Sequence, residues 1–502
     1  MRYSGYILYR ILEILPGLSV WVTLVGAVVL SFTNPLLMIY AVILFDVYWV
    51  LRVINYTFYL LLSWIRYSKI KKIDWNEKLH TLDKKVWHSK RHIVFMTLYK
   101  EDWDVVKSAI TSVALAAEYN TQHVVLVVAG EARAEEHYTK IFSHIKKEFA
   151  SRFGDIVGVL HPKDLPGEIP GKGSNLHYAE QYMKKYIDKK QWHVNEIIVT
   201  IFDIDTICGP EYFMYLTYVY CTHPNPTRTS YQPVALFNNN IWDSPAVLRI
   251  MSFGTTFWIF MGLARQDTLV TFSSHSMSWL ALYEAGFHDK RIVSEDSRIF
   301  YQCFLRYNGQ YDVTPLYTAV SMDTVRDDSW TKSVVNLYKQ QRRWAWGVEH
   351  VPFLIWEFVK KGKKIPLWKK FKWVFIEWEG KWSWCCIAVL ITVIGHLPMR
   401  VAPEVVRQSA LFINTPHLLS ELMKIALIGL FLSAILSMPL LPKKPASHPK
   451  HAYIIMFFQW ALMPITMIVV SAIPAIDAVT HLMRGKYLGF NVSNKKRKTN
   501  TP

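Results

Sequence analysis

Two aspartates separated by one residue, Asp203 and Asp205, directly follow an apolar run at residues 196–202 (EIIVTIF). Carboxylates at positions i and i+2, where a buried strand ends, are hard oxygen ligands of the kind that Mg²⁺ or Mn²⁺ takes. Such an ion is usually shared with a phosphate-bearing substrate. The alternative is a solvated turn in which an aspartate caps the next helix. The pair predicts a metal site if other reactive groups lie beside it.

A second acidic group stands at Ser294-Glu295-Asp296, at the start of a stretch with helical spacing. A carboxylate in that position is suited to take a proton from a hydroxyl group. Serine followed by acidic residues is also typical of a plain helix cap. Both interpretations stay open at the level of the sequence.

Two basic motifs supply cations. The sequence QQRRW places Gln340, Arg343 and Trp344 just before the C-terminal apolar region. Arginine suits diphosphate oxygens and tryptophan suits the face of a sugar ring, although Arg and Trp also anchor proteins at membrane surfaces. The Gly-rich turn at residues 170–175 (PGKGSN) carries Lys172 but lacks the spacing of a P-loop, and a flexible loop is the alternative.

These groups require a scaffold that brings them to one edge, and the chain predicts one. Apolar, β-branched runs at residues 92–98, 123–128, 156–160 and 196–202 alternate with stretches of helical spacing at 102–119 and 131–149. Continuous apolar strands that alternate with helices indicate a mostly parallel sheet with both faces covered. Ligands of such sheets bind beyond the carboxyl ends of the strands, where Asp203 and Asp205 stand.

Apolar segments at both ends of the chain are long enough to enter a membrane. Residues 15–32 carry no charge, and residues 35–62 are apolar apart from Asp46 and Arg52, so the two predict a transmembrane hairpin. An intramembrane charge such as Asp46 rarely faces lipid, which makes it a candidate lining residue of a passage. Three further stretches lie at residues 382–398, 425–441 and 452–476. The plan is membrane, soluble domain, membrane.

The composition agrees with this plan. Apolar residues make up 51% of the 502 residues and charged residues 19%, which excludes intrinsic disorder and a small disulfide scaffold. Five cysteines, two of them adjacent, favour few or no disulfides and a reducing compartment. The net charge of +18 comes largely from clusters that flank the apolar stretches, which indicates positive-inside anchoring and argues against nucleic-acid binding.

The number of C-terminal crossings is left open. If all three C-terminal stretches cross, the basic tail lies on the side opposite the catalytic domain, against the positive-inside rule. Because residues 452–476 contain Pro464, that stretch can instead be a broken or re-entrant segment. The basic tail favours this second interpretation.

In this order and between membrane segments, the motifs resemble the membrane-embedded glycosyltransferase family 2 polysaccharide synthases, such as cellulose, chitin and hyaluronan synthases. The resemblance runs from about residue 93 to residue 346. It rests on TLYKED (Tyr99, Glu101), PGKGSN (Lys172, Asn175), DID (Asp203, Asp205), SED (Glu295, Asp296) and QQRRW (Gln340, Arg343, Trp344). Near the C-terminus, FNVSNK is similar to the family's FxVTxK gating loop, and its matching residues are Phe490, Val492, Ser493 and Lys495.

The resemblance implies an α/β domain of the GT-A type with a mostly parallel sheet, flanked by N- and C-terminal transmembrane helices. It implies that Asp205 and Asp203 hold Mg²⁺ or Mn²⁺ and that Asp296 is the catalytic base. The implied donor-binding residues are Tyr99, Glu101, Glu131, Lys172, Asn175 and Arg343, and the implied acceptor-binding residues are Trp344, Gln340 and Glu295. The family usually has an acidic pair after the second strand, and here only Glu131 is present. A UDP-sugar is therefore only the default donor, and a GDP-sugar remains open.

The expected domains are a transmembrane hairpin (1–66), a cytoplasmic catalytic domain (67–347), amphipathic interfacial helices (348–380), C-terminal transmembrane helices (381–480) and a basic cytoplasmic tail (481–502). The expected location is the inner or plasma membrane. The expected activity is inverting, metal-dependent transfer of sugar to a growing glycan, with processive synthesis and export. The alternatives are transfer of a single sugar to a lipid or short glycan, and a transporter or channel with a nucleotide-binding regulatory domain.

Overall fold

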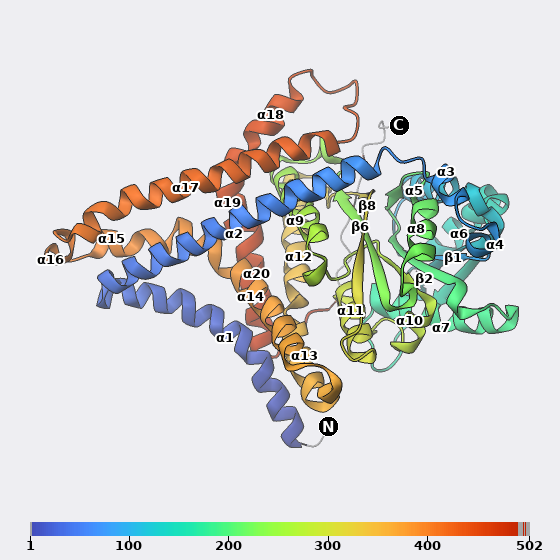
Figure 1. Ribbon diagram of the computed structural model, residues 1–502, viewed down its shortest axis with the longest axis horizontal. Coiled ribbons are helices and arrows are strands. Elements are labelled where there is room, and N and C mark those ends of the chain that lie inside the picture. The colour runs from blue at the N-terminus through green and yellow to red at the C-terminus, as the bar shows by residue number, and fades with distance from the viewer. Residues whose placement is uncertain (1–2, 490–494, 496, 498–502) are drawn as a thin grey trace.

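The computed structural model describes residues 3–489 together with Lys495 and Arg497. It consists of a bundle of long helices and an α/β domain beside it (Figure 1). The chain starts in the bundle, builds the α/β domain and then returns to the bundle. N- and C-terminal helices therefore pack against each other, as α1 (Tyr3–Thr33) does with α20 (Ile473–Met483) and α2 (Pro35–Ile70) with α17 (Ala410–Ser437).

An eight-stranded sheet in the order β3-β2-β1-β4-β7-β6-β8-β5 forms the centre of the α/β domain. Its strands are β1 (Arg91–Leu98), β2 (Val124–Glu131), β3 (Asp155–His161), β4 (Ile197–Asp203), β5 (Ile207–Cys208), β6 (Thr229–Phe237), β7 (Ser276–Ser278) and β8 (Asp312–Met322). The four predicted strands correspond to β1–β4, with boundaries that differ by one or two residues at most ends.

The expectation of a mostly parallel sheet is wrong, because the sheet is mixed. β7 pairs antiparallel with β4 and β6, and β5 pairs antiparallel with β8. Both strands are two or three residues long and come from turns instead of helical crossovers, so they leave no apolar run in the sequence. The six longer strands still run in one direction, since β7 reverses the sense twice between β4 and β6. Their carboxyl ends consequently meet at the same edge.

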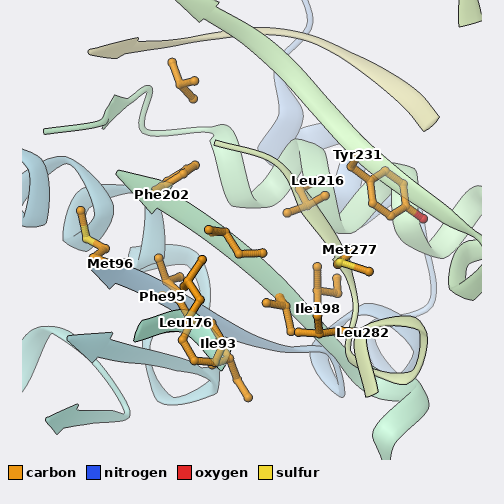
Figure 2. Packing of buried hydrophobic residues seen from close by; sticks show 14 of the residues in the cluster. Ile93, Phe95, Met96, Leu176, Ile198, Phe202, Leu216, Tyr231, Met277 and Leu282 are labelled. Atoms are coloured by element: carbon orange, nitrogen blue, oxygen red, sulfur yellow. The ribbon is translucent and has the colours of Figure 1, made fainter. Parts of the chain in front are cut away.

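Helices on both faces of the sheet exclude water from its strands. Those of the α/β domain are α3 (Trp75–His80), α4 (Lys84–His88), α5 (Trp103–Ala117), α6 (Glu135–Phe149), α7 (Lys172–Lys190), α8 (Tyr212–Thr222), α9 (Ala246–Ala264), α10 (Trp279–Glu284), α11 (Glu295–Arg306) and α12 (Trp330–Ala345). Figure 2 shows Ile93 and Phe95 of β1 beside Leu176 of α7. All three side chains are fully buried, which explains why β1 is apolar on consecutive positions.

Among the described residues, five helices are long and apolar enough to cross a membrane. They are α1, α2, α9, α17 and the helical run at residues 452–483. A sixth candidate is α14 (Leu367–Thr392), which is bent by 41° against residues 394–401. α9 was not predicted as a spanning helix from the sequence. It lies within the α/β domain and packs on α2, where Ser63 Oγ donates to the carbonyl of Phe260.

The region expected to hold two interfacial helices is built differently. α13 (His350–Lys360) is a separate helix and carries the first of them. The second is only the first half of α14, which continues to Thr392 without a break at residue 380. The boundary was expected at residue 380 because the composition changes there from Lys- and Trp-rich to apolar. The helix itself continues through this change, so the expected boundary lies inside α14. α15 (Leu397–Val401) and α16 (Glu404–Arg407) then connect α14 to α17.

The final helical run turns back toward the α/β domain. It consists of α18 (Ala452–Gln459), α19 (Met463–Met467), a π-helical turn (Ile468–Ala472) and α20. Just before it, Trp242 of the α/β domain donates to the carbonyl of Pro442 at 3.0 Å. At its end, Arg10 donates to the carbonyl of Met483 at 3.1 Å, near the α1 terminus that packs on α13 through Tyr9 and Trp356. Both ends therefore lie at the level of the α/β domain.

This arrangement makes a prediction about topology. Single cysteines at Lys72, Ser447 and Lys486 should all react with an impermeant maleimide from the same side of the membrane, and a cysteine at Thr33 only from the opposite side. The reason is that residues 452–483 begin and end beside the α/β domain. Labelling of intact cells and of inverted vesicles, with the parent chain as background, measures this. A cysteine at Lys486 that reacts from the side of Thr33 would contradict it.

Candidate active site

The carboxyl end of β4 carries the two aspartates that begin the site. Asp203 is the last residue of β4, and Asp205 follows in the turn toward β5. Asp205 is fully buried, which excludes the alternative of a solvated turn. Ser273 Oγ donates to Asp203 Oδ2 at 2.6 Å, and the backbone N–H of Asp323 donates to Asp205 Oδ2 at 2.7 Å. Each carboxylate is thus fixed in orientation by a neighbouring segment.

Lys172 opens α7 and points into the same place. Its Nζ lies 2.7 Å from Asp203 Oδ1 and 3.6 Å from Glu295 Oε1. Burial opposes its charge, but the nearby carboxylates of Asp203 and Glu295 outweigh burial and raise the pKa of Lys172 above its ordinary value. Burial likewise opposes ionisation of Asp203, yet the Lys172 ammonium holds the pKa of Asp203 well below its usual range. The Gly-rich turn is an ordered part of the site, because it carries this ion pair.

The first turn of α7 has a close contact at Gly173. A Cβ there would lie 3.0 Å from the carbonyl oxygen of Asp289 and 3.2 Å from Glu295 Cβ. The backbone of α7 therefore touches the loop that leads into α11. This contact sets the position of Lys172 relative to the acidic residues at the start of α11.

The two acidic residues of α11 have different surroundings. Asp296 is partly exposed, and its Oδ1 accepts from the backbone N–H of Ser297 at 2.9 Å. Glu295 is only 3% exposed, and its carboxylate lies beside Lys172. A residue that contacts the acceptor is expected to reach an open surface, and Glu295 does not. Burial raises the pKa of Glu295 to about 7, and Lys172 partly offsets this. Ser294 does not cap the helix with its side chain, because its Oγ donates to Glu349 Oε1 at 2.7 Å.

A third buried carboxylate, Asp323, lies beside Asp205 at the end of β8. Lys495 Nζ lies 2.8 Å from Asp205 Oδ2, and Arg497 Nη2 lies 2.8 Å from Asp323 Oδ1. Burial and the nearby Asp323 and Asp203 charges raise the pKa of Asp205, while Lys495 opposes the shift. The basic tail therefore neutralises two carboxylates at the edge of the sheet. Of the expected gating residues, Phe490, Val492 and Ser493 lie outside the described residues.

The donor set fits a divalent ion that is shared with a substrate. Asp205 Oδ1 is buried and has no hydrogen-bond partner among the described residues, as expected of an oxygen that awaits a cation. No group of three or more His, Cys, Asp or Glu side chains in the described part of the chain is arranged to hold a metal ion by itself. Mg²⁺ commonly takes one or two carboxylates and completes its coordination with substrate phosphates. Asp205, with Asp203 beside it, would hold the ion.

The ends of β1 and β2 carry the expected donor-binding residues. Glu101 Oε2 accepts from the backbone N–H of Tyr99 at 2.8 Å, and burial raises the pKa of Glu101. The Tyr99 ring lies 5.2 Å from the guanidinium carbon of Arg133, and Arg133 also forms an ion pair with Glu131. Asn175 Nδ2 donates to the carbonyl of Ala129 at 2.9 Å, which fixes α7 to the end of β2. Of these residues, Glu101 lies close enough to Asp205 and Lys495 for both charges to act on its pKa, in opposite directions.

α12 carries the QQRRW motif. Gln340 is buried, Arg343 is half-buried, and the Trp344 ring packs 5.3 Å from the ring of Phe237 at the end of β6. Two residues after Phe237, Asn239 Nδ2 donates to the backbone carbonyl of Asp205 at 3.1 Å. Trp344 therefore lies next to the edge that holds the aspartates, and not on an exposed anchoring face.

No family model and no curated protein match this chain. Solved structures that are similar in shape include the following two. A mannosyltransferase from Pyrobaculum calidifontis, in complex with GDP-Man and Mn²⁺, has a TM-score of 0.41 and 14% identity over 76% of this chain and 97% of its own. TarS residues 1–349 from S. aureus have a TM-score of 0.36 and 9% identity over 82% of this chain and 98% of their own. At these values the likenesses assign neither family nor activity.

The sequence analysis missed Asp323 and Asn239. A signal for Asp323 existed, since it follows the strand-like stretch at residues 312–322 as Asp203 follows its own strand. Pro315 in that stretch and Pro233 in the stretch before Asn239 count against strands, and neither strand was predicted. In the structure, β6 and β8 pair in parallel with an irregularity just after Pro233. Pro233 lies at that irregularity, and Pro315 pairs with Gln232 just before it.

The close approach at Gly173 gives a test of the site's geometry. Gly173→Ala should reduce turnover about 3- to 10-fold, because small misplacements of reacting groups slow catalysis. The added methyl group lies against Glu295 Cβ and the carbonyl oxygen of Asp289, and these neighbours must move by a few tenths of an ångström. Gly254→Ala is the matched control, since a Cβ at that position meets nothing within 4 Å. Equal turnover of both variants, with unchanged melting temperatures, would show that the contact does not position the site.

Proposed function

We propose that this protein is a membrane-embedded, inverting glycosyltransferase that transfers a sugar from a nucleotide-sugar donor to an acceptor hydroxyl. The observation that carries the proposal is the convergence at one sheet edge of three features: the aspartate pair with Asp205 fully buried, an ion-paired lysine, and a partly exposed aspartate at a helix start. The resemblance of the same residues to family 2 polysaccharide synthases supports it. The nucleotide stays open between uridine and guanosine.

The chemistry follows from the residues in place. Asp296 accepts the proton of the acceptor hydroxyl, whose oxygen attacks the anomeric carbon from the face opposite the diphosphate. The bond between that carbon and the phosphate oxygen breaks, the configuration inverts, and nucleoside diphosphate leaves. Lys172 and Arg343 contribute positive charge near the leaving group. A divalent ion on Asp205, when bound, neutralises the charge that develops on the diphosphate.

The ion pairs with the basic tail suggest how the site is closed. Lys495 and Arg497 supply positive charge to Asp205 and Asp323. A divalent ion on Asp205 Oδ1 would lie close to the Lys495 ammonium on Oδ2, and repulsion between the two cations favours movement of Lys495 away from Asp205 when the metal and the donor bind. We propose on this ground that the basic tail is cytoplasmic and acts as the gating segment.

Processive synthesis with export is the favoured form of this activity. We propose that Trp344, whose ring packs against Phe237, stacks on the terminal sugar of a glycan. The packing of α13 and α14 against α1 of the helical bundle supports a path for the glycan toward the membrane. Asp46, buried in α2, remains a candidate lining residue of a passage through the membrane. The alternative is transfer of one sugar to a lipid or short glycan. Product length on a gel separates the two, since only the processive enzyme makes long chains.

The central experiment concerns Asp296. Asp296→Asn should abolish transfer from every member of a panel of labelled nucleotide sugars, while donor binding stays within a few-fold of the parent. Asparagine keeps the shape of the side chain but cannot accept the proton. Glu295→Gln is the neighbouring control and should retain measurable transfer, because Glu295 acts through Lys172. Transfer by Asp296→Asn within a few-fold of the parent would remove Asp296 as the base.

The metal makes a second prediction. Activity should require Mg²⁺ or Mn²⁺, and Asp205→Ala should lose the metal-dependent part of nucleoside diphosphate binding, measured by calorimetry. The reason is that Asp205 is the buried carboxylate with an unpaired oxygen. Asp323→Asn should retain metal-dependent binding, since the carboxylate of Asp323 is engaged by Arg497. Full turnover in excess chelator would show that the aspartates have a structural role only.

A further inference from the structure

A crevice between α12 and the π-helical turn of the final helical run lies outside the site described above. Its walls are four valines, two on α12 (Val334, Val335) and two on the π-helical turn (Val469, Val470), together with Tyr338. Lys339 and Arg342 of α12 complete its lining. The crevice is thus an apolar slot with two cationic side chains, a combination that matches an amphiphile with a negative head.

The apolar floor of the crevice continues along the outside of the final helical run. Leu462, Ile465, Val469 and Ile473 are 43%, 65%, 49% and 44% exposed and follow each other at intervals of three or four residues. Helical spacing places them in one row on the surface. A row of large aliphatic side chains at this exposure is suited to lipid and not to water. The same row passes the mouth of the crevice at Val469.

The two cations of the crevice differ in whether a carboxylate neutralises them. Arg342 Nη1 lies 3.0 Å from Asp477 Oδ2, which also accepts from Tyr338 Oη at 3.0 Å, and His481 Nδ1 lies 2.8 Å from Asp477 Oδ1. Lys339 is exposed and has no carboxylate partner in the described part of the chain. Arg342 neutralises Asp477. The positive charge of Lys339 is therefore available to a negatively charged ligand in the crevice.

We propose that this crevice binds an anionic phospholipid of the surrounding bilayer. An acyl chain lies along the valines and the exposed row, and the phosphate diester contacts Lys339 and the outer face of Arg342. A neutral lipid would contact the valines without gaining from the two cations. A soluble phosphate would contact the cations without covering the valines. The opposite face of α12 carries Gln340 and Trp344, so the bound lipid braces the helix that borders the active site. The binding itself does not depend on the proposed function.

The test uses the full-length protein in detergent with a photoreactive phosphatidylglycerol as the probe. After irradiation, mass spectrometry of peptides should place the adduct in residues 334–342 or 469–470. Unlabelled phosphatidylglycerol should compete, whereas phosphatidylcholine and inorganic phosphate should not. Lys339→Ala should weaken apparent affinity about fivefold, as expected for loss of one cation near an anionic headgroup.

Two variants keep the outcome independent of folding. Lys339→Arg keeps the charge and should label like the parent. Lys332→Ala removes an exposed lysine of the same helix that lies outside the crevice and pairs with Asp328 at 3.9 Å, and its labelling should be unchanged. Equal competition by phosphatidylcholine, displacement by inorganic phosphate, adducts elsewhere, or parent-like labelling of Lys339→Ala would each overturn the proposal.

Discussion

The structure depends on the neutralisation of carboxylates that are buried or half-buried at the carboxyl edge of the sheet. Asp203, Asp205 and Asp323 each have one cationic partner: Lys172, Lys495 and Arg497. Removing one member of a buried pair typically costs about 3–5 kcal/mol, because the other charge is left uncompensated. The three partners come from α7 and from the chain end. The edge can therefore form only when segments far apart in the sequence have reached it.

The strand ends made part of this edge visible in the sequence. β1, β2 and β4 are buried on both faces, so their residues are apolar at consecutive positions and Asp203 stands out where the run stops. The other half of the sheet gives no such signal, because β7 is three residues long and β6 and β8 contain prolines. Asp323 was missed for this reason. Lys172 was found from its motif, but its partner Glu295 was expected to contact an acceptor, since burial cannot be read from residue type.

The membrane segments were predictable from the sequence where a long apolar stretch is uninterrupted. They were not predictable where packing against other parts of the protein determines the location of an apolar helix. α1 and α2 follow directly from length and composition. α9 is apolar and long enough to span a membrane, yet half of its apolar stretch is buried in the protein. It packs against α2 and β6. Residues 452–483 are also apolar and long enough to span a membrane. The contacts beside both of their ends nevertheless lie at the level of the α/β domain. Hydropathy measures how apolar a segment is, whereas neighbours determine where it lies.

The joint between α2 and the α/β domain also bears on biosynthesis. Leu60 of α2 belongs to the same buried cluster as the strands, and Arg66 Nη1 donates to Tyr317 Oη of β8 at 3.0 Å. The sequence boundary at residue 66 therefore divides a single hydrophobic core. α2 is synthesised before any strand and is long and apolar enough to cross a membrane. A chain begun at residue 67 would lack Leu60 and Arg66, and its α/β domain would lose the apolar contact and the hydrogen bond that α2 provides.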